Sequence, residues 1–304
     1  MSSGALRCLT LLFLILTGYL LRQAGVLSSA DRGSLAKVFM NISLPAVIVS
    51  SFSAFHYEYS LLVICFIGLL SGFCFAGGLL FAYRNAPVED RAFAVVNGSS
   101  LSIGSFAIPF LQPYLPPFGI LMIILFDTGN SVMAASGCYV LGSRQLGRSQ
   151  GWRTSLRLFF SSTPLCTYLI MFALHMTGFR FPASIYNAAS FIGGANPVIA
   201  MLIIGLTLNL SVTGSVLRKI AGMLSVHYLV ALLLSLIVFF FFPLSDLAKS
   251  VTVVLLASPM TALAIPFTEK LGLDQDMSAM MSSVSILISI VLINLLIPML
   301  RFAS

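Results

Sequence analysis

The chain has 304 residues, of which 59% are hydrophobic and only 8% are charged, and its mean hydropathy is +1.03. Soluble domains carry about 25% charged residues, so this composition excludes an ordinary soluble protein and indicates a polytopic membrane protein surrounded by lipid. The net charge of +7 comes from basic residues in short loops between apolar runs. Such residues are typical of membrane topology signals and do not predict nucleic-acid binding.

Ten apolar segments are long enough to cross a bilayer, since a spanning helix needs about 20 residues. They are expected at 5–22, 36–55, 60–83, 91–112, 118–141, 155–178, 185–209, 218–242, 249–268 and 278–301. The five cysteines lie in these apolar runs without CxxC spacing, so we expect neither disulfides nor a metal site. The fold class predicted from this pattern is an all-α polytopic membrane protein with ten transmembrane helices.

Lysine and arginine are divided unequally between the two sides of this predicted bundle. Twelve lie in or beside the loops that follow the odd-numbered segments, and the opposite side holds only Arg7, Arg180, Lys249 and Arg301. The positive-inside rule therefore predicts that both termini lie on the non-cytoplasmic side of the membrane.

The two halves of the chain repeat the same order of features. The second segment contains Pro45 and the seventh contains Pro197, and an Ala-Ile-Pro-Phe string occurs at 107–110 and again at 264–267. Five segments in each half is an odd number, so the halves must insert with opposite orientation. We predict a first five-helix repeat at 1–142, a cytoplasmic linker at 143–154 and a second, inverted repeat at 155–304.

Polar, glycine- and proline-containing stretches interrupt the fourth and ninth segments, at 97–109 and 257–266. Irregular backbone inside a membrane is tolerated only where protein buries it or a cavity borders it, and paired breaks predict a transporter substrate site. Alternatively, each is an ordinary kinked helix with small residues at a packing face. In the ninth segment either Pro259 or Pro266 marks the break, and we favour Pro259. The candidate substrate-binding residues are Ser102, Gly104, Pro109, Ser258, Pro259 and Thr261.

Asp127 lies about 14 Å into the fifth segment, close to the middle of a hydrocarbon core about 30 Å thick. Intramembrane carboxylates usually mark ion or proton pathways, and burial favours the neutral form, so Asp127 is a candidate coupling residue. Asn130 shares its helix face. The alternative is a neutral or amide-paired aspartate that only ties helices together.

Asn41, four residues before Pro45, and Asn196, directly before Pro197, are further candidates for substrate contact. Repair of the proline kinks explains them equally well. His175 and His227 are interpreted as packing residues. No hydrolase, zinc-protease or P-loop motif is present, so we do not expect an enzyme.

The residues at 41–52 resemble the second helix of the auxin efflux carrier family, and those at 193–208 resemble its seventh. The stretch 102–109 is similar to the crossover motif Asn-Thr-Gly-Phe-Ile-Gly-Ile-Pro of that family. Ser102 stands at the asparagine position, Gly104 and Ala107 at the two glycines, and Pro109 at the proline. The stretch 257–262 resembles the crossover of the ninth helix.

This resemblance implies a fold shared with sodium/proton antiporters and bile-acid symporters. It comprises two inverted five-helix repeats, crossed broken helices 4 and 9, and a scaffold domain that moves against a transport domain. Family members export auxin in plants or carry malate, malonate and other organic anions in bacteria. Serine at 102 and the short central linker depart from the plant members and indicate a compact bacterial member, located in the inner membrane.

The sequence therefore predicts a secondary active transporter for a small organic anion, with a carboxylate favoured. No cofactor is expected beyond a coupling ion, H⁺ or Na⁺. Related folds dimerise through the scaffold domain, so a homodimer is an expectation of the resemblance. A sodium-coupled bile-acid-type symporter and a non-transporting membrane receptor are the alternatives.

Overall fold

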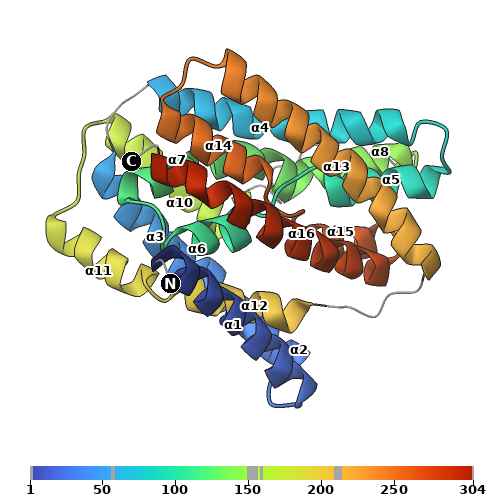
Figure 1. Cartoon of the computed structure of the whole chain (residues 1–304), viewed down its shortest axis with the longest axis horizontal. Helices are drawn as coiled ribbons and strands as arrows, with labels where there is room; N and C mark the ends of the chain where they lie inside the picture. Colours follow the sequence, from blue (N-terminus) through green and yellow to red (C-terminus); the bar gives the residue numbers. More distant parts are fainter. Residues whose placement is uncertain (1–2, 56–58, 149–156, 158–159, 209–213, 303–304) are drawn as a thin grey trace. The chain divides into compact units, whose positions relative to one another are not determined.

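The computed structural model describes residues 3–55, 59–148, 157, 160–208 and 214–302, and the elements within these ranges are helices (Figure 1). The helices pack into two compact units. Unit 1 comprises Met1–Glu58, Gly104–Ile124 and Thr163–Leu208, and unit 2 comprises Tyr59–Ile103, Leu125–Ser162 and Asn209–Ser304. Each unit therefore takes segments from both expected halves, 1–142 and 155–304. Of the expected linker 143–154, residues 149–154 lie outside the described residues.

Unit 1 begins with a long apolar helix packed closely on another from the second half of the chain. Its elements are α1 (Ser3–Gln23), α2 (Ser29–Val38), η1 (Phe39–Ser43), α3 (Leu44–Ser51), η2 (Phe52–Ala54), α6 (Ile108–Leu111), the start of α7 (Pro117–Val132), α10 (Thr163–Met176), α11 (Ala183–Gly193) and α12 (Asn196–Thr207). Helices α1 and α12 lie side by side (Figure 1). Gly18 and Gly205 face each other where they cross, so the two backbones approach without side chains between them.

The two prolines of unit 1 sit where their missing N–H group is least costly. Pro45 lies in the first turn of α3, directly after the π-helical turn η1, in which the Leu44 N–H donates to the Phe39 carbonyl. Pro197 lies in the first turn of α12, after a turn at Gly194 and Ala195. First-turn N–H groups have no intrahelical acceptor, so proline is tolerated there.

Unit 2 contains the second interrupted segment and the first one as far as Ile103. Its elements are α4 (Tyr59–Ala82), α5 (Val88–Gly98), the end of α7, η4 (Met133–Gly137), α8 (Cys138–Gln145), α13 (Gly214–Phe241), α14 (Asp246–Leu256), α15 (Ala264–Lys270) and α16 (Gln275–Phe302). The π-helical turn η3 (Ile103–Ala107) begins at the boundary with unit 1. Glycines again permit close helix contact: a Cβ on Gly129 would overlap the backbone of Cys65 and Leu69 in α4.

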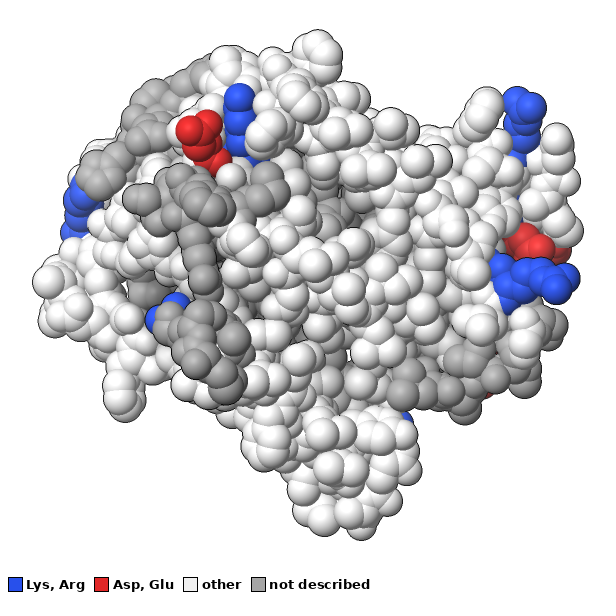
Figure 2. Space-filling model, in the orientation of Figure 1, with Lys and Arg blue, Asp and Glu red and all other residues white. Residues whose placement is uncertain are grey.

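Seven helical stretches within the described residues are long and apolar enough to cross a membrane. They are Leu6–Gln23, Ala30–Ala54, Ser60–Ala82, Pro117–Gln145, Ala183–Thr207, Val216–Phe241 and Gln275–Pro298. Of the three other expected segments, 91–112 and 249–268 are interrupted, and 155–178 contains the shorter apolar helix Thr163–Met176. Charged side chains are few on the face drawn in Figure 2. This is an integral membrane protein.

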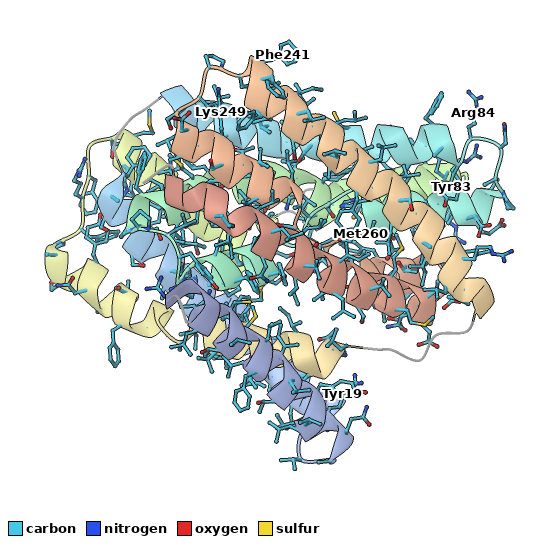
Figure 3. The ribbon with its side chains drawn as sticks, viewed as in Figure 1. Tyr19, Tyr83, Arg84, Phe241, Lys249 and Met260 are labelled. Atoms are coloured by element: carbon cyan, nitrogen blue, oxygen red, sulfur yellow. The ribbon has the colours of Figure 1, made fainter. Side chains whose placement is uncertain are left out.

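Four labelled side chains lie at the two ends of unit 2. Tyr83 and Arg84 lie at one end of the unit, whereas Phe241 and Lys249 lie at the other (Figure 3). An apolar helical length separates them, which is the arrangement that a membrane-crossing unit requires.

Candidate functional site

The two interrupted segments meet in unit 2 through their backbones. Leu101 and Met260 form an isolated antiparallel bridge, and Met260 lies in the connection between α14 and α15 (Figure 3). The Ser102 N–H donates to the Pro259 carbonyl over 2.7 Å, and the Thr261 N–H donates to the Ser100 carbonyl over 3.2 Å. Residues 99–102 and 257–261 are all buried. Each break thus supplies hydrogen-bond partners for backbone groups of the other break that have no partner within a helix.

Local sequence explains where each helix stops. Helix α5 ends at Gly98, and the Ser99 hydroxyl donates back to the Val95 carbonyl, as serine does near helix ends. In the other segment Pro259 follows the end of α14 and cannot donate a backbone hydrogen bond.

The other two prolines do not mark the breaks. Pro109 lies in the first turn of α6, several residues beyond the first break, where its missing N–H is tolerated. Pro266 lies within α15, so the second break falls at Pro259, as favoured from the sequence.

A side chain from α7 holds the first break. The Asn130 carbonyl oxygen accepts from the Leu101 N–H over 3.0 Å, and its amide nitrogen donates to the Leu101 carbonyl over 2.9 Å. The same amide donates to a carboxylate oxygen of Asp127 over 3.1 Å. Asp127 and Asn130 are 7% and 1% exposed. The two predicted residues therefore form one hydrogen-bonded chain. It ends on the bridged residues 99–102 and 257–261, which together are called the crossing.

The second break is held from α16. The Met260 N–H donates to the Ser285 hydroxyl over 3.3 Å, and that hydroxyl donates to the Ser282 carbonyl over 2.8 Å. The Tyr228 hydroxyl, from α13, donates to the Ser285 carbonyl over 2.9 Å. Neither Ser285 nor Tyr228 was among the predicted site residues, because a serine or tyrosine in an apolar helix gives no local signal of such contacts.

Two buried hydroxyls beside the crossing have no hydrogen-bond partner within the described part of the chain. They belong to Ser100 and Ser258, both 0% exposed. Thr261 differs, because its hydroxyl accepts from the Leu263 N–H over 3.3 Å. A buried hydroxyl without a partner is costly, so Ser100 and Ser258 offer unused capacity to bind a polar group.

A polar cluster supports the helices around the first break. Asn97 donates to the Phe93 carbonyl over 3.0 Å and to the Thr268 hydroxyl over 3.1 Å, and the Ser278 hydroxyl donates to the Asn97 carbonyl oxygen. All three side chains are buried. They join α5, α15 and α16, and because their groups are paired, this cluster is structural.

The remaining predicted site residues belong to unit 1. Asn196 is buried; its carbonyl oxygen accepts from the Ser43 hydroxyl over 3.2 Å, and its amide donates to Gln112 over 3.3 Å. Asn41 is exposed, donates to the Lys37 carbonyl over 2.8 Å and accepts from Thr163 over 2.6 Å. Unit 1 also contains Pro45, Gly104, Pro109 and Pro197.

Unit 1 has a cavity of about 420 Å³ that none of the predicted site residues lines. Hydroxyl and amide groups from α3, α11 and the residue after α6 border it, among them Ser50, Gln112 and Tyr186. Gln112 also donates to the Gly193 carbonyl over 3.2 Å and so ties the residue after α6 to the end of α11. Gln112 was not among the predicted site residues, because its partners are distant in the chain.

In the described ranges no three histidine, cysteine, aspartate or glutamate side chains gather as a metal site would require. Fold and site together define a polytopic helical membrane protein in which two interrupted helices are bridged through buried backbone.

The sequence is similar to that of an archaeal protein. The protein is 25% identical over 291 residues to a protein of Methanothermobacter thermautotrophicus named an uncharacterized transporter, covering 93% of this chain and 94% of the relative. No family model matches the sequence.

Proposed function

We propose that this protein is a secondary active transporter that moves a small organic anion, with a carboxylate favoured, by alternating access. The observation that carries the proposal is the crossing of unit 2, where two interrupted helices leave buried backbone and the unpaired Ser100 and Ser258 hydroxyls. Irregular backbone at membrane depth is typical of transporter substrate sites. The similarity to an archaeal protein named a transporter supports the same class.

Pairs of related contacts support ten spans arranged as an inverted repeat. Asn130 of the fifth segment holds Leu101, and Ser285 of the tenth holds Met260. Arg22, at the end of the first segment, donates to the Leu206 carbonyl in the seventh, and Arg180, after the sixth, donates to the Phe55 carbonyl in the second. In each pair, one contact becomes the other when every segment is replaced by its counterpart in the other proposed repeat. This order, with the motif resemblance, favours membership of the auxin efflux carrier family.

In this proposal Ser102, Ser258, Pro259 and Thr261 border the substrate in unit 2, with Ser100 added from the structure. The serine hydroxyls would donate to carboxylate oxygens, a charge-assisted bond roughly twice as strong as one between neutral groups. The unit 1 residues of the proposed set have a different role. Asn196 holds the kink before α12 through Ser43 and Gln112, and Asn41 holds the end of α2 against α10.

Asp127 is the proposed coupling residue because it acts on the crossing through Asn130. An ionised carboxylate binds the Asn130 amide more strongly than a neutral one, and that amide also binds the Leu101 carbonyl. Proton uptake at Asp127 would therefore loosen the orientation of Asn130 and, with it, the first break.

The test is uptake of labelled malate, malonate and indole-acetate into proteoliposomes under an imposed pH or sodium gradient. Accumulation driven by a gradient would establish transport and identify the coupling ion. Folded protein that moves none of these anions under either gradient would contradict the proposal for this substrate class.

Replacing Asp127 with Asn keeps the hydrogen-bond acceptor for Asn130 but removes the titratable group. We expect gradient-driven accumulation to fall at least about tenfold while the melting temperature changes little, since an amide retains the neutral bond. Normal accumulation by Asp127→Asn with unchanged pH dependence would refute the coupling role.

The sodium-coupled symporter remains the second candidate, favoured by the unpaired Ser100 and Ser258 hydroxyl oxygens, which suit a hard cation. It predicts that a sodium gradient drives uptake and a pH gradient does not. A non-transporting receptor predicts ligand binding without flux in either experiment.

A further inference from the structure

His227 contacts the interrupted end of α5 from the middle of α13. Its Nδ1 lies 2.9 Å from the carbonyl oxygen of Gly98, the last residue of α5, and the side chain is 0% exposed. A carbonyl oxygen only accepts, so Nδ1 carries the hydrogen and Nε2 is left with a lone pair. Nε2 is buried, and the described residues provide it with no partner.

The ring is held firmly by aromatic neighbours. Phe75, from α4, stacks on it with ring centroids 4.2 Å apart and planes 15° apart. Tyr228 meets it edge-on at 5.3 Å, with its hydroxyl bonded to Ser285 and Ser289. Stacking at this angle fixes the ring plane, so the free Nε2 cannot reach another partner by rotating without losing the Gly98 bond.

Charged groups of the helices packed on α13 lie away from this ring. Those helices are α4, α5, α14 and α16, and their described charged side chains stand in first helical turns: Glu89, Asp90, Arg91, Asp246, Lys249 and Asp276. Asp90 pairs with Lys219, two turns from His227 along α13. Of the neutral titratable groups, Tyr228 is adjacent and Cys74 precedes Phe75 on α4. His227 is thus the basic group nearest the crossing on these elements.

His227 is connected to both breaks through a single residue. Gly98 lies two positions before Ser100, and a Cβ built on Gly98 would stand 3.5 Å from the terminal methyl carbon of Met260. A charge on the ring would therefore be felt at the backbone and hydroxyls of the crossing, across a short, buried and weakly screened path.

We infer that Nε2 of His227 binds the proton that is moved together with the organic anion. This inference rests on the proposed function and names a coupling group in addition to Asp127. The proton comes from water on the side where the anion enters and adds to the Nε2 lone pair, giving an imidazolium that keeps its Nδ1–H bond to Gly98. The positive ring balances one negative charge of the anion, and the proton leaves with the anion on the other side.

His227→Asn tests the inference, because the asparagine amide replaces Nδ1 as donor to Gly98 but has no basic nitrogen. The matched control is His175→Asn in unit 1. His175 is also buried, but its two ring nitrogens lie 2.9 Å from the Met171 carbonyl and 3.0 Å from the Tyr186 hydroxyl. In proteoliposomes, we compare accumulation driven by a pH gradient with anion exchange at equal pH.

We expect the ratio of gradient-driven accumulation to exchange to fall at least about tenfold in His227→Asn and to stay within about twofold of wild type in His175→Asn. An unchanged ratio in His227→Asn overturns the inference. So does wild-type transport that ignores a pH gradient, although the protein would then still be an anion transporter.

A second measurement decides the inference even if no anion is moved or the variant does not fold. The chain has three histidines, so ¹⁵N spectra of wild-type protein in lipid nanodiscs, assigned with His56→Asn and His175→Asn, report on His227 directly. We expect Nε2 of His227 to gain a proton reversibly as the pH is lowered from about 8 to about 4, and to gain it at a higher pH when malate is present. An Nε2 that stays unprotonated throughout overturns the inference.

Discussion

At the scale of single residues, the Asn130 side chain holds the first break through its hydrogen bonds. Its side chain forms two hydrogen bonds with the backbone of Leu101, as a neighbouring strand would, and a third with Asp127. All of these groups belong to buried residues. The amide therefore substitutes for the helical partners that Leu101 lost when α5 ended.

Replacing Asn130 with Ala leaves the N–H and C=O groups of Leu101 without these partners. Each unsatisfied buried group costs about 1–3 kcal/mol, so we expect the free energy of unfolding to fall by about 2–6 kcal/mol. A thiol-reactive dye that reports exposure of the buried Cys138 measures this in detergent.

Asn294→Ala is the control for this loss. Among the described residues, Asn294 donates only to the Ile290 carbonyl of its own helix, so its loss is expected to change stability by less than about 1 kcal/mol. Equal effects of the two substitutions would show that Asn130 does not hold the break.

The sequence singled out Asp127 and Asn130, because an intramembrane carboxylate is rare and their spacing shares a helix face. Their roles in transport stay predictions. His227 was interpreted as a packing residue, and Ser285 was not among the predicted site residues. The roles of these two depend on which backbone atoms the fold brings beside them, and no local pattern encodes that.

At the scale of elements, close helix contact depends on glycine. In unit 1 a Cβ on Gly205 would overlap backbone atoms of Ile15 and Tyr19 in α1. Neither partner is a flexible side chain, so only movement of a whole helix could relieve the overlap.

Gly205→Ala is therefore expected to destabilise unit 1 by at least about 1–3 kcal/mol, the usual cost of overpacking. Gly77→Ala in α4 is the control: nothing lies within 4 Å of its Cβ position, and alanine favours helix there. Thermal unfolding followed by circular dichroism compares them, and a melting temperature for Gly205→Ala at or above that of Gly77→Ala would contradict the packing argument.

The sequence predicted two interrupted segments, but it located their breaks only in part. Serine and glycine at 97–104 and Pro259 indicated both breaks, whereas the first break precedes Pro109 by several residues. Proline can begin the next helix as readily as it ends the previous one, so its position alone does not locate a break. The bridge between Leu101 and Met260 joins residues 159 positions apart and has no sequence signature.

At the scale of the whole molecule, the distribution of basic residues predicts which side of the membrane each loop occupies. Introduced cysteines at Ala24 and Thr177, in a background without the native cysteines, test this with a membrane-impermeant maleimide. Both positions are exposed, at the ends of α1 and α10. We expect labelling of the Thr177 position in intact cells, and of the Ala24 position only after permeabilisation. The reverse pattern would place both termini in the cytoplasm.

The bridge between the two interrupted segments is made by main-chain atoms, which has a consequence for how this protein diverges. Exchanging one side chain for another at 100, 102, 258 or 261 leaves the bridging N–H and C=O groups in place. In the proposed function these side chains border the substrate, so substitutions there can change selectivity while the geometry of the bridge persists. Saturation libraries at these four positions are accordingly the natural starting point for engineering a new specificity.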